Sequence, residues 1–160
     1  YNYFIKDKSA IKNSFKVLMI EICFVCTGNT CRSVMAERIA RKKAKLRKMK
    51  DLKFSSCGLC AKKENITEYA KSVLKELGYD ARDRKSVKFN KIKPNVIYVA
   101  VTNAHKEKIG AKKCLSFSDL YGEVPDPYGQ TKEIYRMTAK MIEKNIDVLL
   151  DKIENMRGSL

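Results

Sequence analysis

The sequence predicts an α/β fold: a single domain of three layers, with helices on both faces of a four-stranded parallel sheet. Short apolar runs typical of buried strands alternate along the chain with segments whose apolar residues recur at helical spacing. The length of 160 residues, 44% of them hydrophobic, suits one domain with one core. We assign the domain to residues 17–160. Residues 1–16 are polar, aromatic and basic without clear periodicity, and we interpret them as an N-terminal extension, native or artificial.

The first predicted strand and helix lie on either side of a polar segment at residues 26–32. Residues 17–25 form an apolar run interrupted only by Glu21, which is typical of a mostly buried strand. A helix is predicted from Ser33, whose hydroxyl can cap it, to about Leu46, because apolar residues recur there every three to four positions.

The next strand and helix are shorter. Residues 53–57 predict a strand that ends at Gly58. Residues 67–77 predict a helix, with Thr67 as a candidate cap and Gly78 after its last turn.

The second half continues the alternation. Apolar residues at 95–101 predict a strand, 104–109 a short helix, and 113–116 a brief fourth strand. The glycines and prolines of this half gather at 121–130, which predicts a loop, and a long helix is predicted over 131–156.

The most informative segment follows the first strand and reads Cys-Thr-Gly-Asn-Thr-Cys-Arg-Ser at 26–33. Five residues between Cys26 and Arg32 can wrap into a loop whose backbone N–H groups point inward at an anion, helped by the N-terminus of the next helix. The planar guanidinium of Arg32 can hold two phosphate oxygens, and the same positive field favours the thiolate form of Cys26. The loop leaves the carboxyl end of a strand, where parallel sheets bind ligands.

This loop, with Met-Ala-Glu at 35–37, resembles the signature of the low-molecular-weight protein tyrosine phosphatases. The likeness continues in Ser-Cys-Gly at 56–58, in the strand at 96–102 with its following histidine, and in Asp-Pro-Tyr-Gly at 126–129. The resemblance covers roughly residues 17–150 and implies the flavodoxin-like or Rossmann-like sheet of that family.

The resemblance also implies a mechanism. Cys26 would be the nucleophile and form a phosphocysteine, Arg32 would hold two phosphate oxygens, and Asp126 would protonate the leaving group and then accept a proton from water. The implied substrate-binding residues are Thr27, Gly28, Asn29, Thr30, Cys31, Ser33 and Tyr128. Among these, Ser33 would hydrogen-bond the thiolate, Asn29 would hold the loop backbone, and Cys31 could trap an oxidised Cys26 as a disulfide.

Two positions depart from the family pattern, and one histidine is interpreted as structural. Val34 stands where the family usually has proline, which should loosen the start of the helix slightly. Arg84 stands where the family often has a histidine that supports the loop asparagine, so the support of Asn29 stays open. His105, the only histidine, has no role in a thiolate mechanism.

Thr30 bears on the substrate. Tyrosine-specific members usually carry an aliphatic residue there, whereas members resembling the protein arginine phosphatases carry threonine. A hydroxyl can pair with a guanidinium N–H and makes the pocket mouth more polar. Gly129 follows Tyr128 where tyrosine-specific members often have a second aromatic residue. We therefore favour a phosphoarginine phosphatase, with a protein tyrosine phosphatase as the alternative.

The six cysteines leave two further alternatives open. Arsenate reduction on the same fold would need a redox partner for Cys26 among Cys57, Cys60 and Cys114. A structural zinc site is the alternative of another class, because the pairs Cys23/Cys26 and Cys57/Cys60 have zinc-ligand spacing. We expect free thiols, because a chain of this size with an adequate hydrophobic core needs no disulfides for stability. We also expect no metal and no cofactor.

Charge and hydropathy limit the partners. Lys and Arg number 34 against 18 Asp and Glu, a formal net charge of +16 that favours phosphorylated protein substrates, with inorganic phosphate as the product. Nucleic-acid binding is not expected, since no basic motif interleaved with aromatic residues is present. No apolar run reaches the roughly 18 residues that span a membrane, so we expect a cytoplasmic monomer without a membrane partner.

Overall fold

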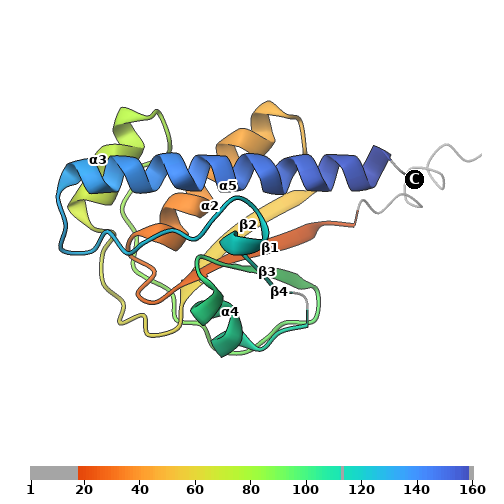
Figure 1. Cartoon of the computed structure of the whole chain (residues 1–160), viewed down its shortest axis with the longest axis horizontal. Helices are drawn as coiled ribbons and strands as arrows, with labels where there is room; N and C mark the ends of the chain where they lie inside the picture. Colours follow the sequence, from red (N-terminus) through yellow and green to blue (C-terminus); the bar gives the residue numbers. More distant parts are fainter. Residues whose placement is uncertain (1–17, 113, 159–160) are drawn as a thin grey trace, which may run out of the picture.

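The computed structural model describes residues 18–112 and 114–158 and confirms the predicted α/β fold with a four-stranded parallel sheet (Figure 1). The strand order is β2-β1-β3-β4, and every neighbouring pair is parallel. The strands are β1 (Ile20–Cys26), β2 (Leu52–Gly58), β3 (Val96–Ala100) and β4 (Cys114–Ser116). The helices are α2 (Arg32–Leu46), α3 (Glu68–Glu76), α4 (Asn103–Ile109) and α5 (Lys132–Gly158), with a 3₁₀ turn, η1 (Phe117–Asp119), after β4.

The two faces of the sheet carry cores of unequal size. Helices α2, α3 and α5 lie together on one face, and α4 lies on the other (Figure 1). The larger core contains the fully buried Ile22 and Phe24 of β1 together with Ile39 of α2 and Ile142 of α5. Successive side chains of a strand point to opposite faces, so β1 also supplies Cys23 and Val25 to the smaller core. The near-continuous apolar run of β1 therefore reflects burial on both faces, as in other parallel sheets.

The predicted elements are all present, with shifted ends. The first strand starts at Ile20 rather than at position 17 and includes Cys26. The extension at 1–16, Val17 and the first residue of the predicted fourth strand, Lys113, lie outside the described residues. Gly78 follows the last turn of α3 with a φ of 76°, the left-handed conformation that glycine adopts most readily.

One of the two predicted helix caps was wrong. The N-cap of α2 is Cys31, and Ser33 is the second helical residue, with its hydroxyl turned to Cys26 and Asn29. Thr67 is the N-cap of α3, but its side chain makes no capping hydrogen bond and instead contacts Cys31. In both cases a polar contact near the loop at 26–33 uses the hydroxyl that a cap would need.

None of the helices in the described part of the chain combines the length and apolar character needed to cross a bilayer. All six cysteines are free thiols, as expected.

Candidate active site

The loop after β1 lies at the carboxyl edge of the sheet, directly against the end of β2. Cys26 pairs in register with Gly58, and a Cβ added at Gly58 would lie 2.6 Å from the carbonyl oxygen of Thr27 and 2.8 Å from the nitrogen of Asn29. Real Cβ atoms do not approach backbone so closely, so a side chain at this position would displace the loop. The glycine in the Ser-Cys-Gly segment is thus required by packing rather than by a turn.

The carbonyl groups of the loop have partners on its outer side. The N–H of Cys60 donates to the oxygen of Thr27 (2.8 Å), and the N–H of Thr67 donates to the oxygen of Thr30 (3.1 Å). Carbonyl groups that point outward leave the loop amides to line the interior, the arrangement of an anion-binding nest.

The thiol of Cys26 lies inside this loop and is almost fully buried, with 3% of the residue exposed. Its sulfur is 3.0 Å from the hydroxyl oxygen of Ser33 and accepts the backbone N–H of Asn29 at 3.3 Å. Asn29 has a φ of 55°, in the left-handed region that asparagine tolerates better than most residues.

The side chain of Asn29 is held by four hydrogen bonds. Its amide nitrogen donates to the hydroxyls of Ser33 (2.8 Å) and Ser56 (2.9 Å). Its amide oxygen accepts the N–H of Val87 (2.8 Å) and one guanidinium N–H of Arg84 (3.0 Å). Because Asn29 sets the backbone of the loop, these contacts fix the loop's shape.

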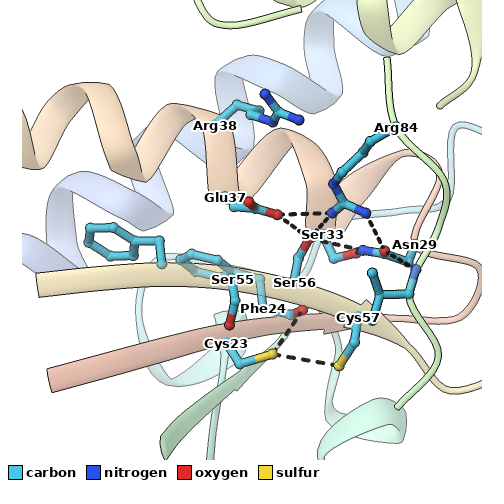
Figure 2. A network of polar contacts seen from close by, with 12 residues as sticks. Cys23, Phe24, Asn29, Ser33, Glu37, Arg38, Ser55, Ser56, Cys57 and Arg84 are labelled. Carbon is cyan, nitrogen blue, oxygen red and sulfur yellow. Dashed lines mark hydrogen bonds and ion pairs between the residues drawn. The ribbon is translucent and has the colours of Figure 1, made fainter. Parts of the chain in front are cut away.

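Arg84 answers the question that the sequence left open. Its guanidinium bonds Asn29, donates to the hydroxyl of Ser56 (2.6 Å) and forms an ion pair with the buried Glu37 (2.9 Å), as Figure 2 shows. Glu37 also pairs with Arg41 one helical turn later. An arginine therefore occupies the supporting position, with its charge balanced by a carboxylate of α2.

Arg32 and Asp126 meet at the mouth of the loop. Arg32 is buried, donates to the carbonyl oxygen of Val124 (3.1 Å) and lies 3.4 Å from a carboxylate oxygen of Asp126. The Asp126 side chain is 55% exposed and accepts the backbone N–H of Tyr128 (3.2 Å), a local turn that orients the carboxylate. The loop at 121–130 thus brings the carboxylate of Asp126 to the guanidinium of Arg32.

A cavity of about 190 Å³ opens at this point. Asp126 and Tyr128 form part of its wall, as the sequence predicted, and Glu64 is a wall residue that sequence reasoning missed. Its only sequence signal would have been its place in the connection between β2 and α3, at the same edge of the sheet as the loop. Loop residues form the rest: Cys26, Thr27, Gly28, Thr30, Cys31 and Arg32.

Two predicted site residues, Asn29 and Ser33, are fully buried beneath the loop rather than in the cavity wall. They contact Cys26 from below, so their position is one of support. These positions agree with the roles expected for Ser33 beside the thiol and for Asn29 in the loop backbone, and their contact with substrate stays a prediction.

Cys31 faces away from the cavity centre toward α3 and α5. Its sulfur is 3.3 Å from the hydroxyl of Tyr135 and 3.4 Å from that of Thr67. Burial, with a further contribution from the contact with Cys31, raises the pKa of Tyr135, which therefore stays protonated at neutral pH. Sequence reasoning did not single out Tyr135.

His105 supports the first residue of the loop. Its Nε2 is 2.8 Å from the hydroxyl of Thr27, and its Nδ1 is 2.6 Å from that of Thr102. Burial and then the charge of Arg32 lower the pKa of the imidazole.

The remaining cysteines do not converge on a common point. Cys23 and Cys57 lie 3.5 Å apart between the sheet and its smaller core, whereas Cys60 is exposed and Cys26 faces its own loop. Across residues 18–112 and 114–158, no group of three or more His, Cys, Asp or Glu side chains could hold a metal ion. Cys57, Cys60 and Cys114 are all absent from the wall of the cavity.

The chain is similar in sequence to phosphatases of low molecular weight. Residues 21–158 match the model of the low molecular weight phosphotyrosine protein phosphatase family. A protein-arginine-phosphatase of Geobacillus stearothermophilus is 33% identical over 83% of this chain and 95% of its own length. The low molecular weight protein-tyrosine-phosphatase PtpB of Staphylococcus aureus is 34% identical over 84% of this chain and 99% of its own.

Solved structures agree with the sequence matches. A low molecular weight protein tyrosine phosphatase from T. tengcongensis has a TM-score of 0.77 at 34% identity, covering 83% of this chain and 99% of that one. An arginine phosphatase from Geobacillus stearothermophilus has the same TM-score at 30% identity, covering 88% and 96%. A family model that spans nearly the whole described chain and the buried thiol at the carboxyl edge of the sheet lead to one conclusion: this chain belongs to the low-molecular-weight protein tyrosine phosphatase family, in which relatives named arginine phosphatases also stand.

Proposed function

We propose that the protein is a cysteine-dependent phosphatase that hydrolyses phosphorylated protein side chains, phosphoarginine in preference to phosphotyrosine, through a phosphocysteine. The observation that carries the proposal is the convergence of Cys26, Arg32 and Asp126 on one small cavity. A thiol held by donors, a buried guanidinium and a half-exposed carboxylate supply a nucleophile, a stabiliser of phosphoryl charge and a proton carrier.

The reaction has two balanced steps. In the first, the thiolate of Cys26 forms a bond to phosphorus while the bond to the leaving nitrogen or oxygen breaks, and protonated Asp126 gives its proton to the leaving atom. In the second, the Asp126 carboxylate takes a proton from water, whose oxygen attacks phosphorus as the P–S bond breaks. Inorganic phosphate leaves, and both side chains return to their starting states. Arg32 holds two phosphoryl oxygens most tightly as charge develops.

The carboxylates at the mouth of the cavity favour a cationic side chain. Glu64 and Asp126 both line the mouth, and Thr30 adds a hydroxyl in place of an aliphatic surface. A guanidinium can donate to all three groups, whereas a phenyl ring gains nothing from carboxylates and needs apolar walls. Tyr128 is the one aromatic wall residue and is 66% exposed, so it provides limited packing for a ring.

The first experiment tests the mechanism on an aryl phosphate. Cys26→Ser is expected to abolish turnover. Asp126→Asn is expected to lose activity in proportion to the pKa of the leaving group, with little loss for good leaving groups because these need no proton. An active Cys26→Ser enzyme would refute the mechanism.

The second experiment tests the substrate by comparing kcat/KM on matched phosphoarginine and phosphotyrosine peptides. Thr30→Ile and Glu64→Gln should each shift the ratio toward phosphotyrosine, by about 10- to 200-fold for a change of roughly 1–3 kcal/mol in one pocket contact. Glu107→Gln, an exposed carboxylate on α4, is the control and should leave the ratio unchanged. A wild-type preference for phosphotyrosine that Thr30→Ile does not alter would instead establish a tyrosine phosphatase.

A further inference from the structure

A basic groove lies at the end of the sheet opposite the candidate site. It has a volume of about 610 Å³ and is bordered by the last turn of α2 and the first residues of β2. Buried Met49 and Leu52 form part of its apolar floor. Lys45, Lys48 and Lys50, which we call the groove lysines, are exposed at its rim.

The groove lysines lack the acidic partners that Lys43 and Arg47, at the same end of the molecule, have. On the side of α2 that faces α5, Lys43 and Arg47 pair with Asp147 at 2.9 and 3.3 Å, and Arg47 also pairs with Asp151 and Glu154. Within the described chain, the ammonium groups of the groove lysines make no ion pair and no hydrogen bond. The positive charge at this groove is therefore uncompensated, which favours an anionic occupant.

One groove lysine is held in an unfavourable backbone conformation. Lys48 follows the C-cap of α2 with a φ of 58°, where glycine or asparagine is usual. Glycine would relieve this backbone strain, so substitution of Lys48 can separate the contribution of its side chain from that of the backbone.

The shape of the groove favours an extended protein segment. β2 is an edge strand whose only strand neighbour is β1 among the described residues, and Lys88 bridges it only at Gly58. The edge beside the groove is partly occupied, because the N–H of Leu52 donates to the oxygen of Met49 (3.4 Å) and the carbonyl oxygen of Phe54 accepts a guanidinium N–H of Arg41 (3.0 Å). An extended peptide there would be held mainly by side-chain contacts with the groove rather than by strand pairing. The apolar floor suits alternate apolar side chains of such a peptide, and the lysines suit its carboxylates.

We propose that this groove docks an acidic, partly apolar, extended segment of the protein substrate. The identification of the partner as a substrate rests on the proposed phosphatase function, whereas binding of the segment itself does not. Six steps along β2 lead from Leu52 in the groove to Gly58 beneath the loop, a distance of roughly 20 Å at about 3.3 Å per residue. The docked segment must therefore lie at least about six extended residues from the phosphorylated one.

The test measures binding of an unphosphorylated fluorescent peptide, Glu-Val-Asp-Leu-Glu-Val-Glu, to the full chain by anisotropy. Reversing the three groove lysines to glutamate should weaken binding at least tenfold, because three exposed charge pairs are lost and replaced by repulsion. Reversing three exposed lysines elsewhere changes the net charge equally and should weaken binding less than threefold. The test triple is K45E/K48E/K50E and the control triple is K75E/K112E/K140E.

A second variant separates binding from folding. Lys48→Gly removes one groove charge and relieves the backbone, so it should weaken peptide binding about threefold while raising the melting temperature. Equal effects of the two triple variants would overturn the proposal, as would displacement of the peptide by a single-stranded oligonucleotide or by phosphatidylserine vesicles at concentrations below those needed for unlabelled peptide.

Measurements of turnover distinguish the proposed phosphatase function from the proposed docking role of the groove. The groove triple variant should hydrolyse an aryl phosphate at the wild-type rate but show a raised KM for a phosphopeptide that carries the acidic segment. If the wild type binds the acidic peptide yet hydrolyses no phosphorylated substrate, the proposed phosphatase function is refuted, whereas binding of an acidic segment in the groove is supported. If the KM is unchanged in an active enzyme, the docking role fails alone.

Discussion

Arg84 offers the sharpest test of how the loop is held. Replacing Arg84 by alanine removes hydrogen bonds to the amide oxygen of Asn29 and to Ser56, and one of two cationic partners of the buried Glu37. The carboxylate of Glu37 is 5% exposed and would keep the hydroxyl of Ser56 and one cationic partner, Arg41, whose side chain is half exposed. The variant should therefore be less stable and less active.

The size of the effect follows from the burial of the pair. Removing one member of a fully buried ion pair costs about 3–5 kcal/mol. The Arg84 side chain is 23% exposed, and Glu37 retains Arg41, so we expect a smaller loss of roughly 2–3 kcal/mol. For a chain of this size, that lowers the melting temperature by roughly 5–10 °C. A displaced Asn29 should reduce kcat by about 10- to 100-fold, since misplacements near 1 Å have effects of that order.

The assay combines urea unfolding with initial rates on an aryl phosphate. Arg82→Ala is the matched control, because that arginine is two residues away, 85% exposed and paired only with Asp80, and it should change stability by less than about 1 kcal/mol. Adding Glu37→Gln to Arg84→Ala should restore part of the stability by removing the poorly compensated carboxylate. Wild-type kcat in Arg84→Ala, or a double variant no more stable than the single, would refute this reasoning.

Three further variants probe other parts of the site and the fold. Gly58→Ala should destabilise the protein by about 1–3 kcal/mol and weaken phosphate inhibition, because its Cβ would collide with Thr27; calorimetry and inhibition constants check this, and an unchanged phosphate affinity would contradict it. Burial and the charge of Arg32 depress the pKa of His105 below the 6.5 of an exposed imidazole, so the unfolded chain binds the proton more readily. The free energy of unfolding should therefore fall as pH drops through 6.5 toward the folded pKa. Urea titrations across this range should show the slope in the wild type and its loss in His105→Asn. Lys48→Gly should stabilise the chain by about 1 kcal/mol, because it removes a left-handed non-glycine residue; a lower melting temperature would contradict that account.

The fold could be predicted from the sequence because the spacing of apolar residues along each strand and helix is a local signal. The apolar run before Cys26, interrupted only by Glu21, and the helical spacing after Ser33 each reflect burial of one element, so both elements were found, although the strand begins later than expected. Thr67 is the N-cap of α3 as expected, but its hydroxyl contacts Cys31 rather than the helix end. The cap predicted at Ser33 was wrong because α2 begins at Arg32, and the Ser33 hydroxyl contacts Cys26. Both contacts come from the tertiary fold, which local sequence patterns do not report.

The candidate site was predictable where its residues share a motif and not where the fold alone assembles it. Cys26 and Arg32 belong to one loop, and Asp126 belongs to a recognisable Asp-Pro segment. Arg84 was identified only as a departure from the family pattern, and its contacts with Asn29 and Glu37 required the structure. Glu64 carries no local signal, because the connection that follows β2 brings it to the cavity.

The contact between Gly58 and the loop has a consequence for how variation in this chain should be interpreted. The shape of residues 26–33 depends on an atom that is missing from a residue some thirty positions later. A homologue could keep every letter of the loop and still lose its anion-binding form if that later position acquired a methyl group. A sequence can therefore carry the motif at 26–33 without forming the anion-binding loop. A survey of related sequences should examine this motif together with the position that corresponds to Gly58.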